Sequence, residues 1–200
     1  MTISRRHLLA TGLAALGASA TRVAAHDVAP ASAVLPPQYM PQIVPIQPGL
    51  LPGQIHVDPN QFALYWTLPD QTAIRYTVGI ASAGLYEPGT YFIGAKKEWP
   101  SWTPTPDMVA RQPELYGPYA EDGMPGGPEN PLGARALYLF TTERGDTFMR
   151  IHGTNKPETI GSAVSNGCVR LINEHVVDLY ARVPMDTPVT FYPQGGFLPV

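Results

Sequence analysis

Short segments of β type, separated by turn residues, constrain this chain more than any other sequence feature. Residues 54–58 alternate between apolar and polar positions, and residues 62–68 form a run rich in β-forming side chains. Each of these two segments is followed by a proline with an Asn or Asp, which is typical of a turn. Further segments of this type cover residues 73–80, 90–95, 134–141, 148–152 and 187–192. The sequence therefore predicts a mostly β domain built from short strands.

One packed helix is expected over about residues 174–183. Apolar residues recur there at i, i+3, i+4 and i+7 from Val176 to Val183, which is the spacing of a buried helix face. Asn173 is predicted to be the N-cap, because its short polar side chain suits that position, and Pro184 is predicted to end the helix. The predicted fold is thus mostly β with a single packed helix.

The first 25 residues have the pattern of an export signal. Residues 4–9 read SRRHLL, and the apolar run that follows, residues 8–20, is too short to span a bilayer. Small residues near Ala25 offer a cleavage site. We therefore expect residues 1–25 to be a twin-arginine signal peptide, with the mature protein in the periplasm and no transmembrane segment left after cleavage. An uncleaved amphipathic helix is the alternative interpretation.

The rest of the chain divides into an arm, a domain and a tail. Residues 26–51 contain six prolines and few charges, which predicts a proline-rich linker or arm, because proline is excluded from helix interiors and central strands. Residues 52–193 are long enough for one domain with one core. Residues 194–200 are expected to form a C-terminal tail.

Charge and cysteine content exclude several classes of protein. Removal of residues 1–25 takes away three of the 13 basic residues and none of the 16 acidic ones, which leaves 10 basic residues and a formal net charge of −6. A chain this acidic is not expected to bind nucleic acid, which selects a basic face. A single cysteine excludes an intramolecular disulfide framework. In an exported protein it is either a reactive thiol or half of an intermolecular bridge.

The chemistry of the chain is expected at Cys168 and His152. Cys168 follows Gly167, which suits a tight turn where backbone comes close to a substrate. His152 ends the predicted strand 148–152, and the 16-residue separation lets the chain leave the strand, turn and return. An imidazole beside a thiol can activate it as a nucleophile. The spacing alone does not identify a family, because cysteine–histidine signatures differ between families.

Together these motifs resemble the active-site signature of the L,D-transpeptidases, the YkuD-type enzymes that cross-link bacterial peptidoglycan. The signature is a histidine, here in His152-Gly153, then a gap, then Ser/Thr-x-Gly-Cys closed by Arg or Asn, here Ser165-Asn-Gly-Cys-Val-Arg170. The resemblance extends over roughly residues 52–192. This chain departs from it at Asn166, where many members carry histidine.

The resemblance implies a β-sandwich-like or mixed-sheet domain and a cysteine acyl-transfer reaction without a cofactor. Cys168 would be the nucleophile and His152 the general base and acid, with the backbone carbonyl of Gly153 orienting the His152 ring. The substrate would be a peptidoglycan stem tetrapeptide that loses its terminal D-alanine. The acceptor would be the amine of a second stem or of a wall-anchored protein.

Residues around the cysteine are candidates for the oxyanion and substrate sites. Backbone N–H groups of Asn166, Gly167 and Cys168 are placed to bind an oxyanion. Ser165 and Arg170 complete the candidate set, because a planar guanidinium suits bidentate binding of a substrate carboxylate. An alternative role for Arg170 is to brace the catalytic loop through backbone carbonyls.

Residues 97–133 are predicted to form an ordered lid over the Cys168 site. The segment is rich in proline and glycine, and it carries Trp99, Trp102 and Tyr116, which argue against disorder. Residues 105–111 are predicted to form one short helix, with Thr105 as its cap. The alternative is a packed loop that covers a sheet face and takes no part in the reaction.

Two alternative functions fit the same residues. An L,D-carboxypeptidase or another cysteine peptidase would use the same residues with water as acceptor. A non-catalytic cell-wall-binding module would keep the fold without the reaction. A metal site is not expected, because no Cys-x-x-Cys or His-x-x-x-His spacing is present.

Overall fold

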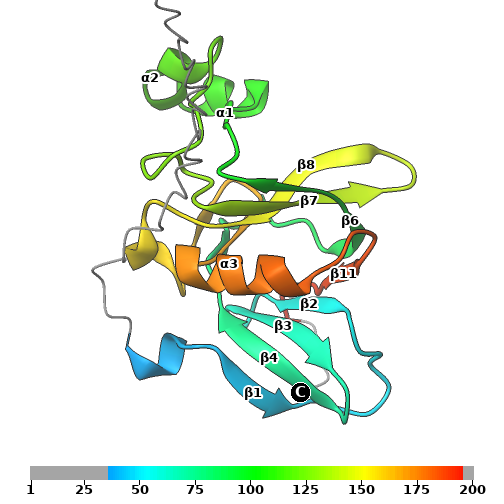
Figure 1. Ribbon diagram of the computed structural model, residues 1–200. Coiled ribbons are helices and arrows are strands. Elements are labelled where there is room, and N and C mark those ends of the chain that lie inside the picture. Colours follow the sequence, from blue (N-terminus) through cyan, green and yellow to red (C-terminus); the bar gives the residue numbers. More distant parts are fainter. Residues whose placement is uncertain (1–35, 196–200) are drawn as a thin grey trace, which may run out of the picture.

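The computed structural model describes residues 36–195, and the predicted signal peptide lies outside them. One nine-stranded mixed sheet organises the domain, with the strand order β1-β4-β3-β2-β11-β6-β7-β8-β10 (Figure 1). Its strands are β1 (Gln42–Pro45), β2 (Ile55–Asp58), β3 (Ala63–Leu68), β4 (Thr72–Thr77), β6 (Gly89–Glu98), β7 (Arg135–Thr141), β8 (Gly145–His152), β10 (Val169–Arg170) and β11 (Pro188–Phe191). A separate two-stranded sheet pairs β5 (Ile80–Ala81) with β9 (Ala163–Ser165). The mostly β, mixed-sheet fold class predicted from the sequence is confirmed.

Helices are few and short. They are α1 (Pro106–Arg111), α2 (Pro113–Tyr116) and α3 (Asn173–Arg182), with 3-10 turns η1 (Pro37–Tyr39), η2 (Gly117–Tyr119) and η3 (Pro157–Thr159). Among the residues that the structure describes, no helix is long and apolar enough to cross a membrane. The predicted helix over residues 174–183 is confirmed as α3, with both ends shifted by one residue.

The core lies between α3 and strands from both halves of the sheet (Figure 1). Val176 and Leu179 of α3 are fully buried, as their helical spacing predicted. They join one apolar cluster with Tyr76 of β4 and Ile151 of β8. Because β8 belongs to this cluster, its last residue, His152, directly follows a residue of the core.

The N-terminal end of α3 differs from the prediction. Its N-cap is Ile172, which makes no side-chain capping hydrogen bond, and Asn173 is the first helical residue. The prediction of Asn173 as the N-cap is therefore wrong. The reason is tertiary: the Asn173 side chain hydrogen-bonds the backbone of two other loops, at Ala134 and Thr154.

Three short strands were not expected from the sequence. β1 lies within the proline-rich arm and pairs antiparallel with β4 at one edge of the sheet, a position where proline is tolerated. β9 and β10 have only three and two residues. Segments this short carry too few alternating positions to be recognised locally.

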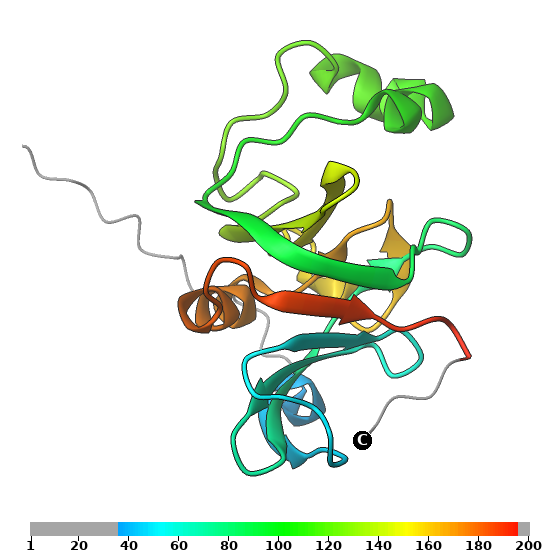
Figure 2. The same cartoon turned by 90° about the vertical axis from the view of Figure 1, so that its right-hand side faces the viewer.

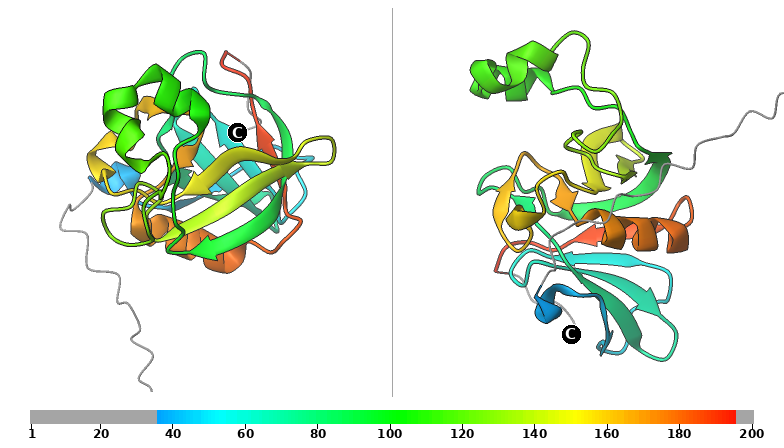
Figure 3. Two further views of the ribbon diagram at one scale, coloured as in Figure 1. Left: turned by 90° about the horizontal axis from the view of Figure 1, so that it is seen from above. Right: turned by 60° about the vertical axis from the view of Figure 1, so that its left-hand side comes forward.

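The connection between β6 and β7 carries α1 and α2, which stand away from the sheet (Figures 2 and 3). The predicted short helix and its cap are confirmed, since the Thr105 hydroxyl accepts a hydrogen bond from the Met108 backbone N–H over 3.3 Å. At the root of the connection, Trp102 and Met124 exchange two backbone hydrogen bonds of 2.8 and 2.6 Å. The segment is thus ordered and closed at its base.

Candidate active site

Two neighbouring strands bring Cys168 and His152 into one site. β8 ends at His152, and β10, which directly follows Cys168, pairs parallel with β8 so that Arg170 lies opposite His152. The Leu171 backbone N–H donates to the His152 carbonyl over 2.8 Å. Cys168 and His152 both line a cavity of about 910 Å³, which we call the Cys168 cleft.

His152 is buried, at 4 % exposure, and is held as a neutral imidazole. Its Nδ1 lies 2.6 Å from the Gly153 carbonyl oxygen. Because a carbonyl only accepts, Nδ1 carries the proton and the lone pair is on Nε2. The pKa of His152 is lowered to about 3, chiefly by burial; the Gly153 carbonyl opposes this effect, and the charges of Arg170 and Arg150 add to the lowering.

Cys168 is a partly exposed thiol whose pKa is raised by burial. A hydrogen bond from the Arg150 backbone and the charges of Arg150 and Arg170 oppose this rise in the thiol pKa. The resting site is therefore a neutral thiol beside a neutral imidazole. A neutral imidazole can accept the proton of a thiol during nucleophilic attack, which is the chemistry of a general base.

Asn173 positions the peptide that orients His152. Its Oδ1 accepts from the backbone N–H of Ala134 over 2.9 Å and from that of Thr154 over 3.2 Å. The Gly153 carbonyl and the Thr154 N–H belong to the same planar peptide unit. By holding the Thr154 N–H, Asn173 fixes the direction of the carbonyl that binds His152 Nδ1.

Two glycines make room for this arrangement. A Cβ on Gly153 or on Gly133 would collide with Asn173 Oδ1, and Gly133 has a φ of +63°, a conformation that favours glycine. Neither glycine is close in sequence to Asn173. The positioning role of Asn173 therefore has no signal in the sequence, where the residue resembles a helix cap.

The loop before Cys168 is tied down on both sides. The buried Ser165 hydroxyl donates to the Cys168 carbonyl over 2.6 Å. The exposed Asn166 side chain accepts from Arg111 Nη2 over 3.0 Å and donates to the Tyr116 hydroxyl over 2.9 Å. Asn166 thus connects the cysteine loop to α1 and α2.

Arg170 lines the cleft with an incompletely paired guanidinium. Its Nε and Nη2 atoms are buried and have no hydrogen-bond partner within residues 36–195. Gly79 lies against them, where a Cβ would come within 3.4 Å of Nη2. These two nitrogens therefore do not brace any backbone carbonyl, which was the alternative role for this residue.

Two of the three predicted lid aromatics face the cleft. Trp102 and Tyr116 line it and meet edge to face, with ring centroids 6.1 Å apart, and Tyr119 packs on Trp102 at 6.0 Å. Trp99 is not among the lining residues. Its backbone N–H instead donates to the Ala134 carbonyl over 2.9 Å at the root of the lid.

Some of the residues that line the cleft were not selected from the sequence, Arg150, Lys156 and Phe148 among them. Three cationic side chains line it, those of Arg150, Lys156 and Arg170, against one carboxylate, Glu129. Exposed apolar side chains line it as well, Phe148 among them. The lining is thus net positive in a chain whose formal net charge is −3.

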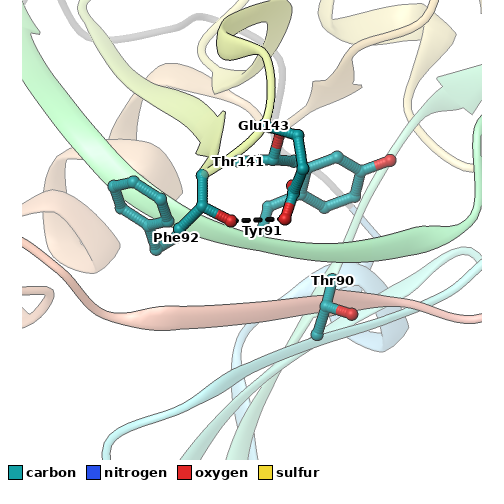
Figure 4. A pocket seen from close by; sticks show the side chains of 6 residues that line it. Thr90, Tyr91, Phe92, Thr141 and Glu143 are labelled. Atoms are coloured by element: carbon teal, nitrogen blue, oxygen red, sulfur yellow. Dashed lines mark hydrogen bonds between the residues drawn. The ribbon is translucent and has the colours of Figure 1, made fainter.

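A second hollow differs from the cleft in size and lining. A smaller hollow of about 300 Å³ lies beside β6 and the β7–β8 turn, lined by Tyr91, Phe92 and Thr141 among others (Figure 4). It contains no histidine or cysteine. Within the described residues, no group of three His, Cys, Asp or Glu side chains is arranged to hold a metal ion.

Comparison with known proteins identifies the family of the chain. The family model of the L,D-transpeptidase catalytic domain (YkuD) matches residues 52–191. The probable L,D-transpeptidase ErfK/SrfK of Escherichia coli K12 is 32% identical over 172 residues, which are 82% of this chain and 53% of that protein. The probable L,D-transpeptidase YbiS of the same strain is 36% identical over 149 residues, covering 71% of this chain and 46% of that protein. The chain thus spans about half the length of these relatives.

Solved structures share the fold. A Brucella melitensis protein described as a probable carnitine operon oxidoreductase is 48% identical, with a TM-score of 0.54 over 76% of this chain and 93% of that one. An L,D-transpeptidase from Mycobacterium smegmatis is 13% identical, with a TM-score of 0.52 over 70% of this chain and 58% of that one, a likeness of fold alone. The description as an oxidoreductase refers to the Brucella melitensis protein only. On the family match over residues 52–191, this chain belongs to the L,D-transpeptidase catalytic-domain (YkuD) family.

Proposed function

We propose that this protein is a peptidoglycan L,D-transpeptidase that forms cross-links by cysteine acyl transfer from stem tetrapeptides and releases D-alanine. The observation that carries the proposal is the neutral pair of Cys168 and His152 in one cleft, with the proton of His152 held on Nδ1 by the Gly153 carbonyl. This tautomer leaves Nε2 as the proton acceptor that a thiol nucleophile needs.

The first half-reaction forms a thioester. Cys168 Sγ attacks the carbonyl carbon between the diamino acid of the stem and its terminal D-alanine, while His152 takes the thiol proton. Backbone N–H groups of Gly167 and Cys168 are the proposed oxyanion donors. The C–N bond then breaks, His152 returns the proton to the leaving nitrogen, and D-alanine departs.

The second half-reaction transfers the acyl group. An acceptor amine attacks the thioester carbon and forms the new C–N bond, giving one proton to His152. The C–S bond breaks, and the departing sulfur of Cys168 recovers that proton. One amide bond is exchanged for another, so the reaction needs no oxidant, reductant or cofactor.

The charges of the cleft support an anionic donor. Arg150 is already paired with Asp146, whereas the Arg170 guanidinium has two buried nitrogens without a partner in the described chain. We assign Arg170 to a carboxylate of the stem peptide, with Lys156 as a second cation near it. Stem peptides carry several carboxylates, which suits a net positive cleft.

The lid is proposed to protect the thioester from water. Trp102 and Tyr116 line the cleft, and Asn166 connects the lid to the cysteine loop. A dry site favours an amine over water as acceptor. The amine would come from a second stem or from a wall-anchored protein in the periplasm, which is the compartment that the pattern of residues 4–9 predicts.

The decisive experiment is intact-protein and product mass spectrometry after incubation with tetrapeptide muropeptides. We expect a thioester adduct, free D-alanine and cross-linked dimers, all absent with Cys168→Ala. With His152→Ala, acylation should slow by about 10²–10⁴-fold, the usual effect of losing a general base. Tripeptide as the sole product would identify an L,D-carboxypeptidase, and the absence of both adduct and product would indicate a non-catalytic wall-binding module.

A further inference from the structure

Phe148 shares a row with the catalytic histidine. Residues 148, 150 and 152 belong to β8, and all three line the Cys168 cleft. Phe148, at the far end of this row, is 70 % exposed. The row thus leads from His152 past Arg150 to a large apolar side chain that nothing in the domain buries.

The backbone at Phe148 is strained. Its φ of +62° is unfavourable for a bulky L-residue, and among the described residues it is the only non-glycine positive φ inside a strand. The pairing of β7 with β8 is irregular here. Tyr138 pairs with Arg150 and Phe140 pairs with Asp146, so β8 advances by four residues where β7 advances by two. Bulges beside functional sites commonly redirect a side chain.

Asp146 holds this conformation in place. Its carboxylate accepts from the Phe148 backbone N–H over 2.8 Å and binds the Arg150 guanidinium through bonds of 2.7 and 2.9 Å. The Arg150 guanidinium also lies over the Tyr138 ring, 4.1 Å from its centroid. The strained residue and its neighbour in the row are therefore fixed before any substrate arrives.

Apolar exposure concentrates at this cleft. Seven large hydrophobic side chains are exposed in the described part of the chain, and three of them, Phe148, Val164 and Leu115, line the cleft. They come from β8, β9 and α2, three segments distant in sequence. An exposed apolar rim of this kind marks a surface that contacts another molecule.

We propose that Phe148 is a specificity-determining residue that contacts the acceptor. The inference rests on the proposed function, in which His152 exchanges protons first with the leaving amine and then with the entering one. Both amines must lie next to His152, on the β8 side of the cleft. The acyl part of the donor lies on the other side, towards Cys168 and Arg170.

The distance between Phe148 and His152 determines which acceptors can contact both residues. Three strand residues lie between Phe148 and His152, and the four steps along β8 span up to about 13 Å. A free amino acid spans only about 3.5 Å and does not reach from His152 to Phe148. An amine carried on a peptide does, so Phe148 favours peptide acceptors over free amino acids.

The test compares two acceptors in the full chain. The donor is a tetrapeptide muropeptide, and the acceptors are a stem tripeptide and isotopically labelled D-alanine. Phe148→Ala should raise the KM for the tripeptide by about tenfold, the effect of losing a partly buried aromatic contact, and should leave the KM for D-alanine and the rate of acyl-enzyme formation unchanged. Phe148→Tyr should behave as wild type.

Strain supplies an independent readout. Phe148→Gly should raise the KM for the tripeptide as Phe148→Ala does. Its Tm should be as high as that of Phe148→Ala or up to about 2 °C higher, because glycine adopts the positive φ freely. Gln71→Gly is the matched control, since Gln71 is exposed, has a φ of +56° and lies in the β3–β4 turn. It should keep both KM values.

Each other outcome overturns a defined part of the inference. Equal losses with both acceptors, or slower acyl-enzyme formation in Phe148→Ala, would place the ring on the donor or give it a purely structural role. A Tm of Phe148→Gly several degrees below that of Phe148→Ala would mean that the backbone stores no strain. If the wild type forms no acyl-enzyme at all, the proposed function fails, while the comparison of Tm values still reports on the strained strand.

Discussion

Asn173 offers the sharpest test of how the fold controls the chemistry. Its single amide oxygen accepts from the backbone N–H groups of Ala134 and Thr154, at 2.9 and 3.2 Å. Asn173→Ala removes this acceptor and leaves both donors without it. Ala134 is fully buried and Thr154 is 3 % exposed, so neither N–H is well placed to turn to bulk water.

The expected cost follows from these two groups. A buried donor left without a partner costs about 1–3 kcal/mol, so losing the acceptor of both donors in Asn173→Ala should lower the free energy of unfolding by about 2–6 kcal/mol. For a domain of this size the Tm should fall by on the order of 10 °C. The freed Gly153–Thr154 peptide should also let the His152 ring turn, and a catalytic group displaced by about 1 Å loses on the order of 10²-fold in rate.

The matched control is Asn173→Asp. A carboxylate keeps the accepting oxygen, and its negative charge is favourable in the first turn of α3. Thermal unfolding and the rate of acyl-enzyme formation per folded molecule should therefore stay near wild type in Asn173→Asp and fall together in Asn173→Ala. Wild-type acylation in folded Asn173→Ala would refute the idea that this side chain positions His152 through the Gly153 carbonyl.

Two further predictions concern acid stability and the lid. His175 is buried without a hydrogen-bond partner among the described residues, and burial lowers its pKa below the unfolded value of about 6.5. Below about pH 6.5 the unfolded chain therefore binds more protons than the folded chain, and the free energy of unfolding falls as the pH drops. His175→Leu should reduce this fall, measured by denaturant unfolding between pH 7 and 5. The same dependence of the free energy of unfolding on pH in His175→Leu and wild type would contradict this. Asn166→Ala breaks both hydrogen bonds to the lid, at Arg111 and Tyr116, and should raise the ratio of hydrolysis to transpeptidation about threefold to fivefold. Arg111→Ala breaks one of these bonds and should give a smaller rise. Equal product ratios in wild type and both variants would mean that Asn166 does not hold the lid closed.

Much of the domain was predictable because the relevant signals are local. Each of the seven predicted β segments overlaps an observed strand, since alternation and turn residues act over a few positions. The helix α3 was recognised from the spacing of its apolar face for the same reason. The family followed from motifs of a few residues around His152 and Cys168, which the match over residues 52–191 confirms.

The arrangement around those motifs was decided only by tertiary structure. Asn173 resembles a cap in the sequence, yet its side chain binds two loops 19 and 39 residues away. The neutrality of the thiol–imidazole pair arises from burial. Two arginines that the fold brings near it favour the neutral imidazole and oppose the rise in the thiol pKa. Sequence patterns report on each residue's immediate neighbours. Which groups share a buried site, and therefore which protons and charges they hold, depends on contacts between distant segments that exist only once the sheet has formed.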